Sequence, residues 1–461
     1  MSLFLMYILR DGVVKVKKQN MKIDRKSGEN IMKKVALHNL GCKVNAYETQ
    51  AMQEMLEQAG YDIVPFQEGA DIYIINTCTV TNIADRKSRQ MLHRARKMNP
   101  DAVVVAAGCY VQAQAEKQEI DPCIDVVIGN NRKQDLLAIL KAYEQEHSEQ
   151  KDVIDINHTN EYETLSLSKT GEHTRAYIKV QDGCNQFCSY CIIPYARGRV
   201  RSRKKLDVVE EVTRLAQNGY REVVLTGIHL SSYGIDLEGE ESLLTLLEAV
   251  HEIEGIQRIR LGSLEPRIIT EEFVKKIVNM PKICPHFHLS LQSGCDETLK
   301  RMNRRYDSKE FLEKCNLLRK YFENPALTTD VIVGFPGETQ EEFEETKAFL
   351  ENIQFYETHI FKYSKREGTK AAVMEHQIPE QEKARRSAIL IELGEKNKKE
   401  YEKKFLGKTV EVLVEEKANI NGGEVWVGHT KEYMKIALEG DGNLQNCILN
   451  VQIDREEQII H

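Results

Sequence analysis

"AYIKVQDGCNQFCSYC", residues 176–191, joins a strand-like run to a loop in which three cysteines are spaced C-x3-C-x2-C. The β-branched and aromatic residues of 176–181 predict a β-strand. Further strand-like runs follow, separated by stretches with helical spacing such as 206–219. These runs are EVVLTG (222–227), RIRLGS (258–263), HFHLSL (286–291), TTDVIVGF (328–335) and ETHIFKY (357–363). Six strand–helix units predict an α/β fold with a partial parallel (β/α)6 barrel over residues 170–395. Cys184, Cys188 and Cys191 follow its first strand, at the carboxyl edge where such barrels bind ligands.

Residues 33–150 predict a separate open parallel α/β domain. Short β-branched runs alternate there with two helical stretches, 47–60 and 84–98. The runs are KVALHNL (34–40), DIYIIN (71–76), AVVVAA (102–107) and IDVVI (124–128). Alternation of this kind is typical of a parallel sheet with crossover helices.

Three cysteines stand just beyond the ends of three of these runs: Cys42, Cys78 and Cys109. In an open parallel sheet those ends share one edge, which is where ligands bind. The cysteines are separated by about one strand–helix repeat each, so we expect the three thiols to converge in space. Three unrelated buried cysteines are the alternative.

The other five of the eleven cysteines have no partner at a ligand spacing. An odd number of cysteines in a chain without a secretory signal argues against a disulfide framework. We therefore expect Cys123, Cys284, Cys295, Cys315 and Cys447 to be small buried side chains.

The C-terminal part changes character after a long charged helix predicted over 380–405. Short strand-like runs follow, broken by Asn-Gly, Gly-Gly and Asp-Gly turns. They predict a small antiparallel β-barrel over 396–461, a TRAM-like fold of the kind that binds nucleic acid. Trp426 and Tyr433 are candidates either for stacking on bases or for its core.

Residues 1–32 are expected to be an N-terminal extension outside the functional core. Their apolar start has no preceding basic stretch and no cleavage site, so a secretory signal is not expected, and no later stretch is long enough to span a membrane. A cytoplasmic protein without membrane association is therefore expected. The net charge of −7 means that nucleic-acid binding has to be argued from local clusters.

The chemistry of the 184–191 triplet has two interpretations. A structural zinc site needs four ligands, and only His229, His286 or His288, all distant in sequence, would complete one. Closely spaced thiolates also bind iron–sulfur clusters, and a cubane held by three leaves one iron open to another ligand.

The C-x3-C-x2-C loop, with Tyr190 just before its last cysteine, resembles the radical S-adenosylmethionine enzymes. The resemblance implies that Cys184, Cys188 and Cys191 hold a catalytic 4Fe-4S cluster. S-adenosylmethionine would chelate its open iron and be cleaved to a 5'-deoxyadenosyl radical. Further cofactor contacts implied by position are Tyr190, Ser263, Glu265, Gln292 and Asp330.

From Lys33 onward the chain resembles the radical S-adenosylmethionine methylthiotransferase family, whose members insert sulfur into a C–H bond and methylate it. The resemblance implies that Cys42, Cys78 and Cys109 hold a second, auxiliary 4Fe-4S cluster that carries the sulfur. It also implies a one-electron reductant of the flavodoxin or ferredoxin type and a sulfur donor as partners.

Within this family, HNLGCKVNAYET (38–49) and NTCTVTNIADRKSRQ (76–90) resemble the branch that acts on N6-threonylcarbamoyladenosine in tRNA. The isopentenyladenosine branch tends to read GCQMN at the first cysteine and the ribosomal-protein branch GCPKN, whereas this chain reads GCKVN. The implied substrate is the tRNA anticodon stem-loop, at adenine C2 just 3' of the anticodon. Methylthiotransfer to isopentenyladenosine or to a ribosomal protein stays open, as does a non-catalytic zinc-stabilised RNA-binding protein.

A row of alternating arginines follows the triplet: Arg197, Arg199, Arg201 and Arg203. On an extended segment they share one side, which suits an RNA phosphate backbone. The basic stretch RMNRRY (301–306) and the terminal barrel favour this interpretation. A solvated, charge-guarded edge is the alternative.

Overall fold

The computed structural model describes residues 32–114, 121–146, 150–169, 174–420 and 422–460. The extension predicted over 1–32 lies outside these residues except for Met32. Residues Lys33–His461 form one compact unit. The structure divides this unit into sheets rather than domains, so the predicted domain limits stay predictions.

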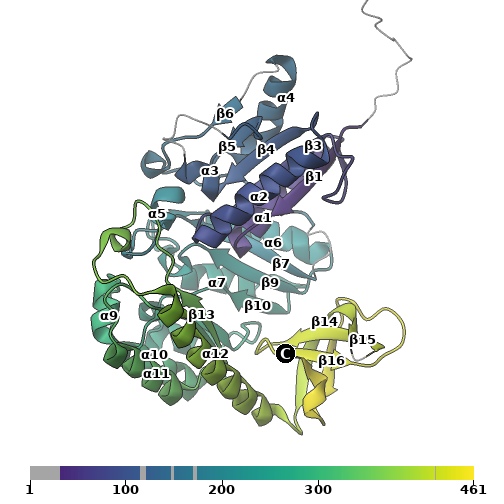
Figure 1. Cartoon of the computed structure of the whole chain (residues 1–461). Coiled ribbons are helices and arrows are strands. Elements are labelled where there is room, and N and C mark those ends of the chain that lie inside the picture. Colours follow the sequence, from purple (N-terminus) through teal and green to yellow (C-terminus); the bar gives the residue numbers. More distant parts are fainter. Residues whose placement is uncertain (1–31, 115–120, 147–149, 170–173, 421, 461) are drawn as a thin grey trace, which may run out of the picture. The chain divides into compact units, whose positions relative to one another are not determined.

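The N-terminal sheet is six-stranded and wholly parallel, in the order β2-β1-β3-β4-β5-β6. All four predicted strands are confirmed, as β1 (Lys34–Asn39), β3 (Ile72–Thr77), β4 (Val103–Gly108) and β5 (Val126–Ile128). Two short edge strands were not predicted, β2 (Asp62–Ile63) and β6 (Gln150–Asp152). The helices of this part are α1 (Lys43–Gln58), α2 (Asn82–Met98), α3 (Cys109–Ala113) and α4 (Leu136–Glu146), drawn in purple and blue in Figure 1.

All six predicted barrel strands are confirmed. They are β7 (Arg175–Asp182), β9 (Glu222–Gly227), β10 (Arg258–Leu261), β11 (His286–Gln292), β12 (Ala326–Val333) and β13 (Glu357–Lys362). They form the sheets β10-β9-β7-β8 and β11-β12-β13, joined by parallel bridges at Ile259–Ile283 and Leu264–Leu289. The added strand β8 (Arg201–Ser202) runs antiparallel to β7, so the edge of the first sheet is formed by the arginine row itself.

Helices line the outside of these strands and bury one large apolar core between the two layers. They are α6 (Lys205–Gln217), α7 (Leu243–His251), α8 (Glu271–Ile277), α9 (Asp296–Arg301), α10 (Ser308–Tyr321) and α11 (Gln340–Ile353). Local sequence fixes where some of them begin. Thr339 and Glu342, for example, form a capping box that satisfies backbone N–H groups at the start of α11.

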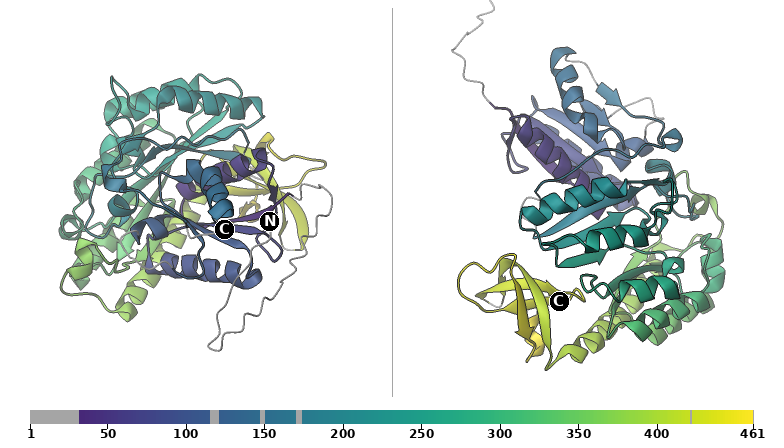
Figure 2. Two further views of the ribbon diagram at one scale, coloured as in Figure 1. Left: turned by 90° about the horizontal axis from the view of Figure 1, so that it is seen from above. Right: turned by 180° about the vertical axis from the view of Figure 1, so that it is seen from behind.

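The C-terminal part consists of α12 (Glu380–Glu402) and a five-stranded antiparallel sheet in the order β17-β14-β15-β16-β18. The strands are β14 (Thr409–Ile420), β15 (Gly423–Thr430), β16 (Lys435–Leu438), β17 (Ile448–Gln452) and β18 (Ile459–Ile460), drawn in yellow in Figures 1 and 2. The predicted limit between 395 and 396 falls inside α12. Trp426 is buried in the core of this sheet. None of the helices in the described ranges is both long enough and apolar enough to cross a membrane.

Candidate functional site

Cys42, Cys78 and Cys109 lie at the carboxyl ends of three neighbouring parallel strands, as predicted. Cys42 is the N-cap of α1, Cys78 directly follows β3, and Cys109 is the first residue of α3, directly after β4. Burial raises the pKa of Cys78, and the neighbouring thiols of Cys109 and Cys42 raise it further. The structure thus brings together three residues that are far apart in sequence.

Glycine and hydrogen bonds hold this edge tightly packed. Gly41 has φ of +107°, and a Cβ there would lie 3.0 Å from the Cys78 Sγ, so only glycine lets the loop after β1 approach so closely. Asn45 Nδ2 donates to the carbonyls of Leu40 at 2.7 Å and Thr77 at 2.9 Å, tying together the chain segments that lead to Cys42 and Cys78. The Ser88 hydroxyl accepts from the Cys78 backbone N–H at 3.1 Å.

Cys184, Cys188 and Cys191 share the loop after β7. Its backbone is anchored on both sides: the Cys184 N–H donates to the Gly198 carbonyl at 3.0 Å, and the Ser189 N–H donates to the Met302 carbonyl at 3.0 Å. Gly183, with φ of +71°, is required here because a Cβ would lie 1.8 Å from the Arg199 carbonyl oxygen. The loop therefore has one fixed path.

Both triplets fit an iron–sulfur cluster better than a single metal ion. All six cysteines are free thiols. Within the described ranges, neither triplet has its three sulfur atoms within 4.8 Å of one another. Thiolates bound to one Zn²⁺ at about 2.3 Å would have to be closer than that. A cubane with several irons spans a larger ligand set.

Burial favours the protonated form of most of these thiols in the metal-free chain. It raises the pKa of Cys78 and of Cys184 to about 11, with Cys188 contributing at Cys184. Burial also raises the pKa of Cys191 to about 12, and the pKa of Cys42 is raised as well. Cluster assembly therefore has to displace protons from these thiols.

Arg304 lies in the basic stretch RMNRRY (301–306), which favours RNA binding in the sequence, and the structure places it beside the cysteine loop. Its Nη1 donates to the Cys188 Sγ at 3.2 Å, and its Nε donates to the Tyr306 hydroxyl at 2.9 Å. Its remaining terminal nitrogen donates to the Ser290 carbonyl at 3.2 Å. The RMNRRY stretch thus supplies a cation to the cysteine loop.

The predicted S-adenosylmethionine contacts divide into two groups. Tyr190 is half-buried against Phe335, and Glu265 is buried and accepts from Arg267 Nε at 2.8 Å. Burial raises the pKa of the Tyr306 hydroxyl, and the Glu265 carboxylate raises it further.

The other three residues predicted to contact S-adenosylmethionine differ from one another in exposure and in their partners. Ser263 is exposed after β10, and Gln292 ends β11 with a positive φ of 74°. Asp330 pairs with His288 Nε2 at 3.2 Å and belongs to a cluster on β11, β12 and β13 that also contains His359. The three histidines considered for a zinc site have other partners. His288 forms a hydrogen bond with the Thr328 hydroxyl, His286 stacks on the Tyr433 ring, and His229 forms a hydrogen bond with the Ser232 hydroxyl.

The arginine row requires a correction. Arg197 and Arg201 are fully buried, and Arg203 is 5% exposed. Arg197 pairs with Glu48 at 2.8 Å and with Asp182 at 3.0 Å, and Arg203 forms an ion pair with Glu211. A phosphate cannot reach these three guanidinium groups. Only Arg199 keeps partial exposure, with its guanidinium 4.5 Å from the Phe187 ring centroid.

Arg197 instead helps to connect the two cysteine sites, together with Asn130. Arg197 Nη2 donates to Asn45 Oδ1 at 2.6 Å, and Asn45 stands three residues after Cys42. Asn130 Nδ2 donates to the Ala196 carbonyl at 2.7 Å and lies 3.5 Å from the Cys109 Sγ. The segment that follows Cys191 therefore contacts the surroundings of both Cys42 and Cys109.

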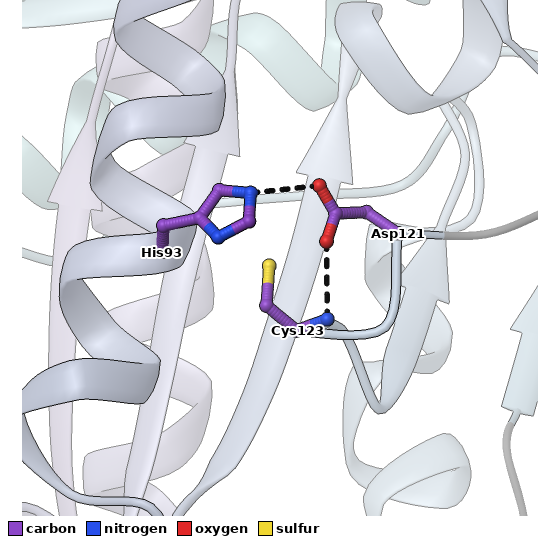
Figure 3. A group of neighbouring side chains, drawn as sticks. All are labelled: His93, Asp121 and Cys123. Carbon is purple, nitrogen blue, oxygen red and sulfur yellow. Dashed lines mark hydrogen bonds and ion pairs between the residues drawn. The ribbon is translucent and has the colours of Figure 1, made fainter.

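Cys123 belongs to neither triplet but lies beside His93 and Asp121 (Figure 3). His93 Nε2 is 2.9 Å from Asp121 Oδ2, and Asp121 Oδ1 accepts from the Cys123 N–H at 3.1 Å. These bonds tie α2 to the turn before β5. Burial raises the pKa of Cys123 to about 12, so this thiol stays protonated. Cys123, Cys284, Cys295 and Cys315 are buried as expected, whereas Cys447 is half-exposed, contrary to the prediction.

Comparisons with known proteins agree with this architecture. Residues 178–350 match the model of the Radical SAM superfamily, and residues 34–129 match that of Uncharacterized protein family UPF0004. The first match covers most of the predicted barrel, and the second covers strands β1 to β5 of the N-terminal sheet with all three of its strand-end cysteines.

Two curated relatives and one solved structure illustrate the similarity. Threonylcarbamoyladenosine tRNA methylthiotransferase MtaB of Bacillus subtilis (strain 168) is 41% identical over 92% of this chain and 94% of that protein. The tRNA-2-methylthio-N(6)-dimethylallyladenosine synthase of Acetivibrio thermocellus is 34% identical over 95% of this chain and 92% of that protein. The radical S-adenosylmethionine methyltransferase TsrM from Kitasatospora setae shares the fold, with a TM-score of 0.53 at 15% identity over 74% of this chain and 77% of that chain. Because relatives this similar match nearly their whole length, the chain is an enzyme that belongs to the radical S-adenosylmethionine methylthiotransferase family.

Proposed function

We propose that this enzyme transfers a methylthio group to C2 of N6-threonylcarbamoyladenosine, just 3' of the anticodon in tRNA. The observation that carries the proposal is the pair of three-cysteine sites, each at the carboxyl ends of parallel strands and linked through Arg197 and Asn130. A relative named for threonylcarbamoyladenosine tRNA supports the choice of base at 41% identity. The non-catalytic zinc interpretation is excluded by the family.

As a member of its family, the enzyme uses S-adenosylmethionine and 4Fe-4S clusters, which supply a carbon radical and transferable sulfur when bound. We propose Cys184, Cys188 and Cys191 as ligands of the radical-generating cluster and Cys42, Cys78 and Cys109 as ligands of the auxiliary one. The Arg304 guanidinium would hold a positive charge beside the sulfur of Cys188. Tyr190, Ser263, Glu265, Gln292 and Asp330 remain the proposed S-adenosylmethionine contacts.

In this proposal, the side chains outside the two cysteine sites position these sites relative to each other and do not themselves react. The carboxyl edge of the N-terminal sheet contacts the loop after β13, because Arg366 Nη1 donates to Asn82 Oδ1 at 2.6 Å and Arg366 Nη2 donates to Thr79 Oγ1 at 2.8 Å. These bonds hold the loop after β13 against the segment that follows Cys78, so the barrel and the N-terminal sheet are in contact near the cysteines. A base held between them would be within reach of both, and such proximity governs rate.

The remaining assignments complete the proposal. The C-terminal antiparallel sheet would be a TRAM-like RNA-binding part, following a domain order of 33–150, 170–395 and 396–461. The partners of the enzyme would be the tRNA anticodon stem-loop, a flavodoxin- or ferredoxin-type reductant and a sulfur donor. The enzyme would act in the cytoplasm.

Mass spectrometry of tRNA nucleosides tests the substrate. Cells lacking the gene should accumulate N6-threonylcarbamoyladenosine without its 2-methylthio derivative, and restoring the gene should return that derivative. Loss of the 2-methylthio group from isopentenyladenosine instead, or from a ribosomal protein, would replace the proposed substrate with that one.

The radical assignment is tested by iron content and cofactor cleavage. Protein purified without oxygen should hold about eight irons, and a Cys184→Ala, Cys188→Ala, Cys191→Ala variant about four, because each triplet holds one cluster. The variant should no longer produce 5'-deoxyadenosine from S-adenosylmethionine. Full cleavage by this variant would remove the assignment of the 184–191 loop.

A further inference from the structure

Lys43 immediately follows Cys42 and is the first residue of α1. Its side chain is exposed, and its ammonium group makes no hydrogen bond or ion pair within the described part of the chain. A lysine in the first turn of a helix opposes the helix dipole, and no acidic residue stands in that turn to compensate. Stabilisation of α1 therefore does not explain this lysine.

The charged neighbours of Lys43 come from the barrel and the terminal sheet. Arg175, Arg260, Asp330 and Tyr433 are all close enough to act on it electrostatically. Arg175 is paired with Glu415 at 2.9 Å and Arg260 with Glu222 at 2.8 Å. These two arginines are therefore neutralised by carboxylates of their own.

Asp330 is also engaged elsewhere. Its carboxylate lies 3.2 Å from His288 Nε2, and His288 stacks on His359 with ring centroids 5.8 Å apart. Among the described residues, Asp330 forms its ion pair with His288 and none with Lys43. In this group of charges, Lys43 is thus the cation without a counter-ion among the described residues.

The proposed substrate has an anion at the matching place. In adenine, C2 and C6 flank N1, so a substituent on N6 lies at the same edge of the base as C2. The threonylcarbamoyl substituent ends in a carboxylate, whereas a dimethylallyl substituent is apolar. A residue next to the sulfur-delivering site at Cys42 is therefore well placed to meet the threonyl carboxylate.

We propose, on the basis of the function proposed above, that Lys43 binds the threonyl carboxylate of the substrate and so selects it over bases with apolar N6 substituents. A charge-assisted hydrogen bond would hold the carboxylate. An apolar substituent would instead remove water from the ammonium group without replacing that interaction, which is unfavourable.

Binding of two anticodon stem-loop RNAs tests this inference without relying on turnover. One carries N6-threonylcarbamoyladenosine, and the other carries the same base with the carboxylate replaced by a neutral carboxamide. The wild-type enzyme should bind the acid about 10- to 100-fold more tightly than the amide. Lys43→Met should bind the two RNAs equally, and Lys43→Arg should keep most of the preference.

Lys34→Met is the matched control, because Lys34 is an exposed lysine at the opposite end of β1 from Cys42. It should leave the acid-to-amide ratio unchanged, and all variants should keep about eight irons. An unchanged ratio in Lys43→Met would overturn the role of Lys43 while leaving the proposed function intact. Absence of methylthio product on the acid RNA with wild-type enzyme would instead overturn the proposed function.

Discussion

Arg197 shows at the scale of one residue how the two cysteine sites are held together. Its side chain is fully buried and bonds Glu48, Asp182 and Asn45. Glu48 also pairs with Lys133 at 3.1 Å and Lys179 at 2.8 Å, so opposite charges balance inside the protein. Breaking such a buried set by removing one member is costly.

Arg197→Leu should lower the free energy of unfolding by about 3–5 kcal/mol, because carboxylates remain buried with one cation fewer. Arg199→Leu is the matched control and should change it by less than about 0.5 kcal/mol, since Arg199 is half-exposed. Urea unfolding of both variants under anaerobic conditions measures the difference. Equal midpoints for the two variants would show that the buried network does not stabilise the protein.

The sequence could not reveal this role. The alternation of the arginines indicates that their side chains share one side of an extended segment. It does not indicate what they contact there, because Glu48, the partner of Arg197, lies 149 positions away in the sequence. Nothing local distinguishes an arginine that meets a distant carboxylate from one that meets a phosphate. The contact of Arg304 with Cys188 was hidden from the sequence in the same way, because it spans 116 positions.

At the scale of secondary structure, long buried strands were predictable and short edge strands were not. β9 and β12 are rich in β-branched residues and mostly buried, as expected for parallel strands that are covered on both faces. β2, β6 and β18 have two or three residues each, too few to show a period. The cysteine positions follow from the long strands, which is why the convergence of Cys42, Cys78 and Cys109 could be predicted.

Glu402, the last residue of α12, provides a test at this scale. It is 4% exposed, and burial raises its pKa to about 7, with Lys398 opposing the shift. Since the unfolded chain ionises near the ordinary glutamate value, stability is lost as pH rises from about 4 to about 7. Below that range both states are protonated, and above it both are ionised.

Glu402→Gln mimics the protonated side chain and should remove this loss. The variant should be about 1–3 kcal/mol more stable than the wild-type protein at pH 8 and nearly equal to it at pH 4.5. Urea midpoints at the two pH values measure the effect. A variant that is less stable at pH 8 would show that the ionised carboxylate is well compensated in the folded protein.

At the scale of the whole molecule, we propose separate tasks for the two cysteine sites. Repeats within the sequence were sufficient to place each triplet at a sheet edge. They were not sufficient to show how the edges are joined, because Asn130, Arg197 and Arg366 reach across between segments distant in sequence. These contacts keep two sites in one working unit.

The variant Cys42→Ala, Cys78→Ala, Cys109→Ala tests this division of tasks most directly. Circular dichroism first establishes that the variant is folded, and iron analysis should give about four irons. With a strong reductant, we expect it to produce 5'-deoxyadenosine from S-adenosylmethionine but no 2-methylthio product on tRNA that carries N6-threonylcarbamoyladenosine. Formation of the methylthio product by the folded variant would contradict the assignment of the N-terminal triplet and the two-site mechanism with it.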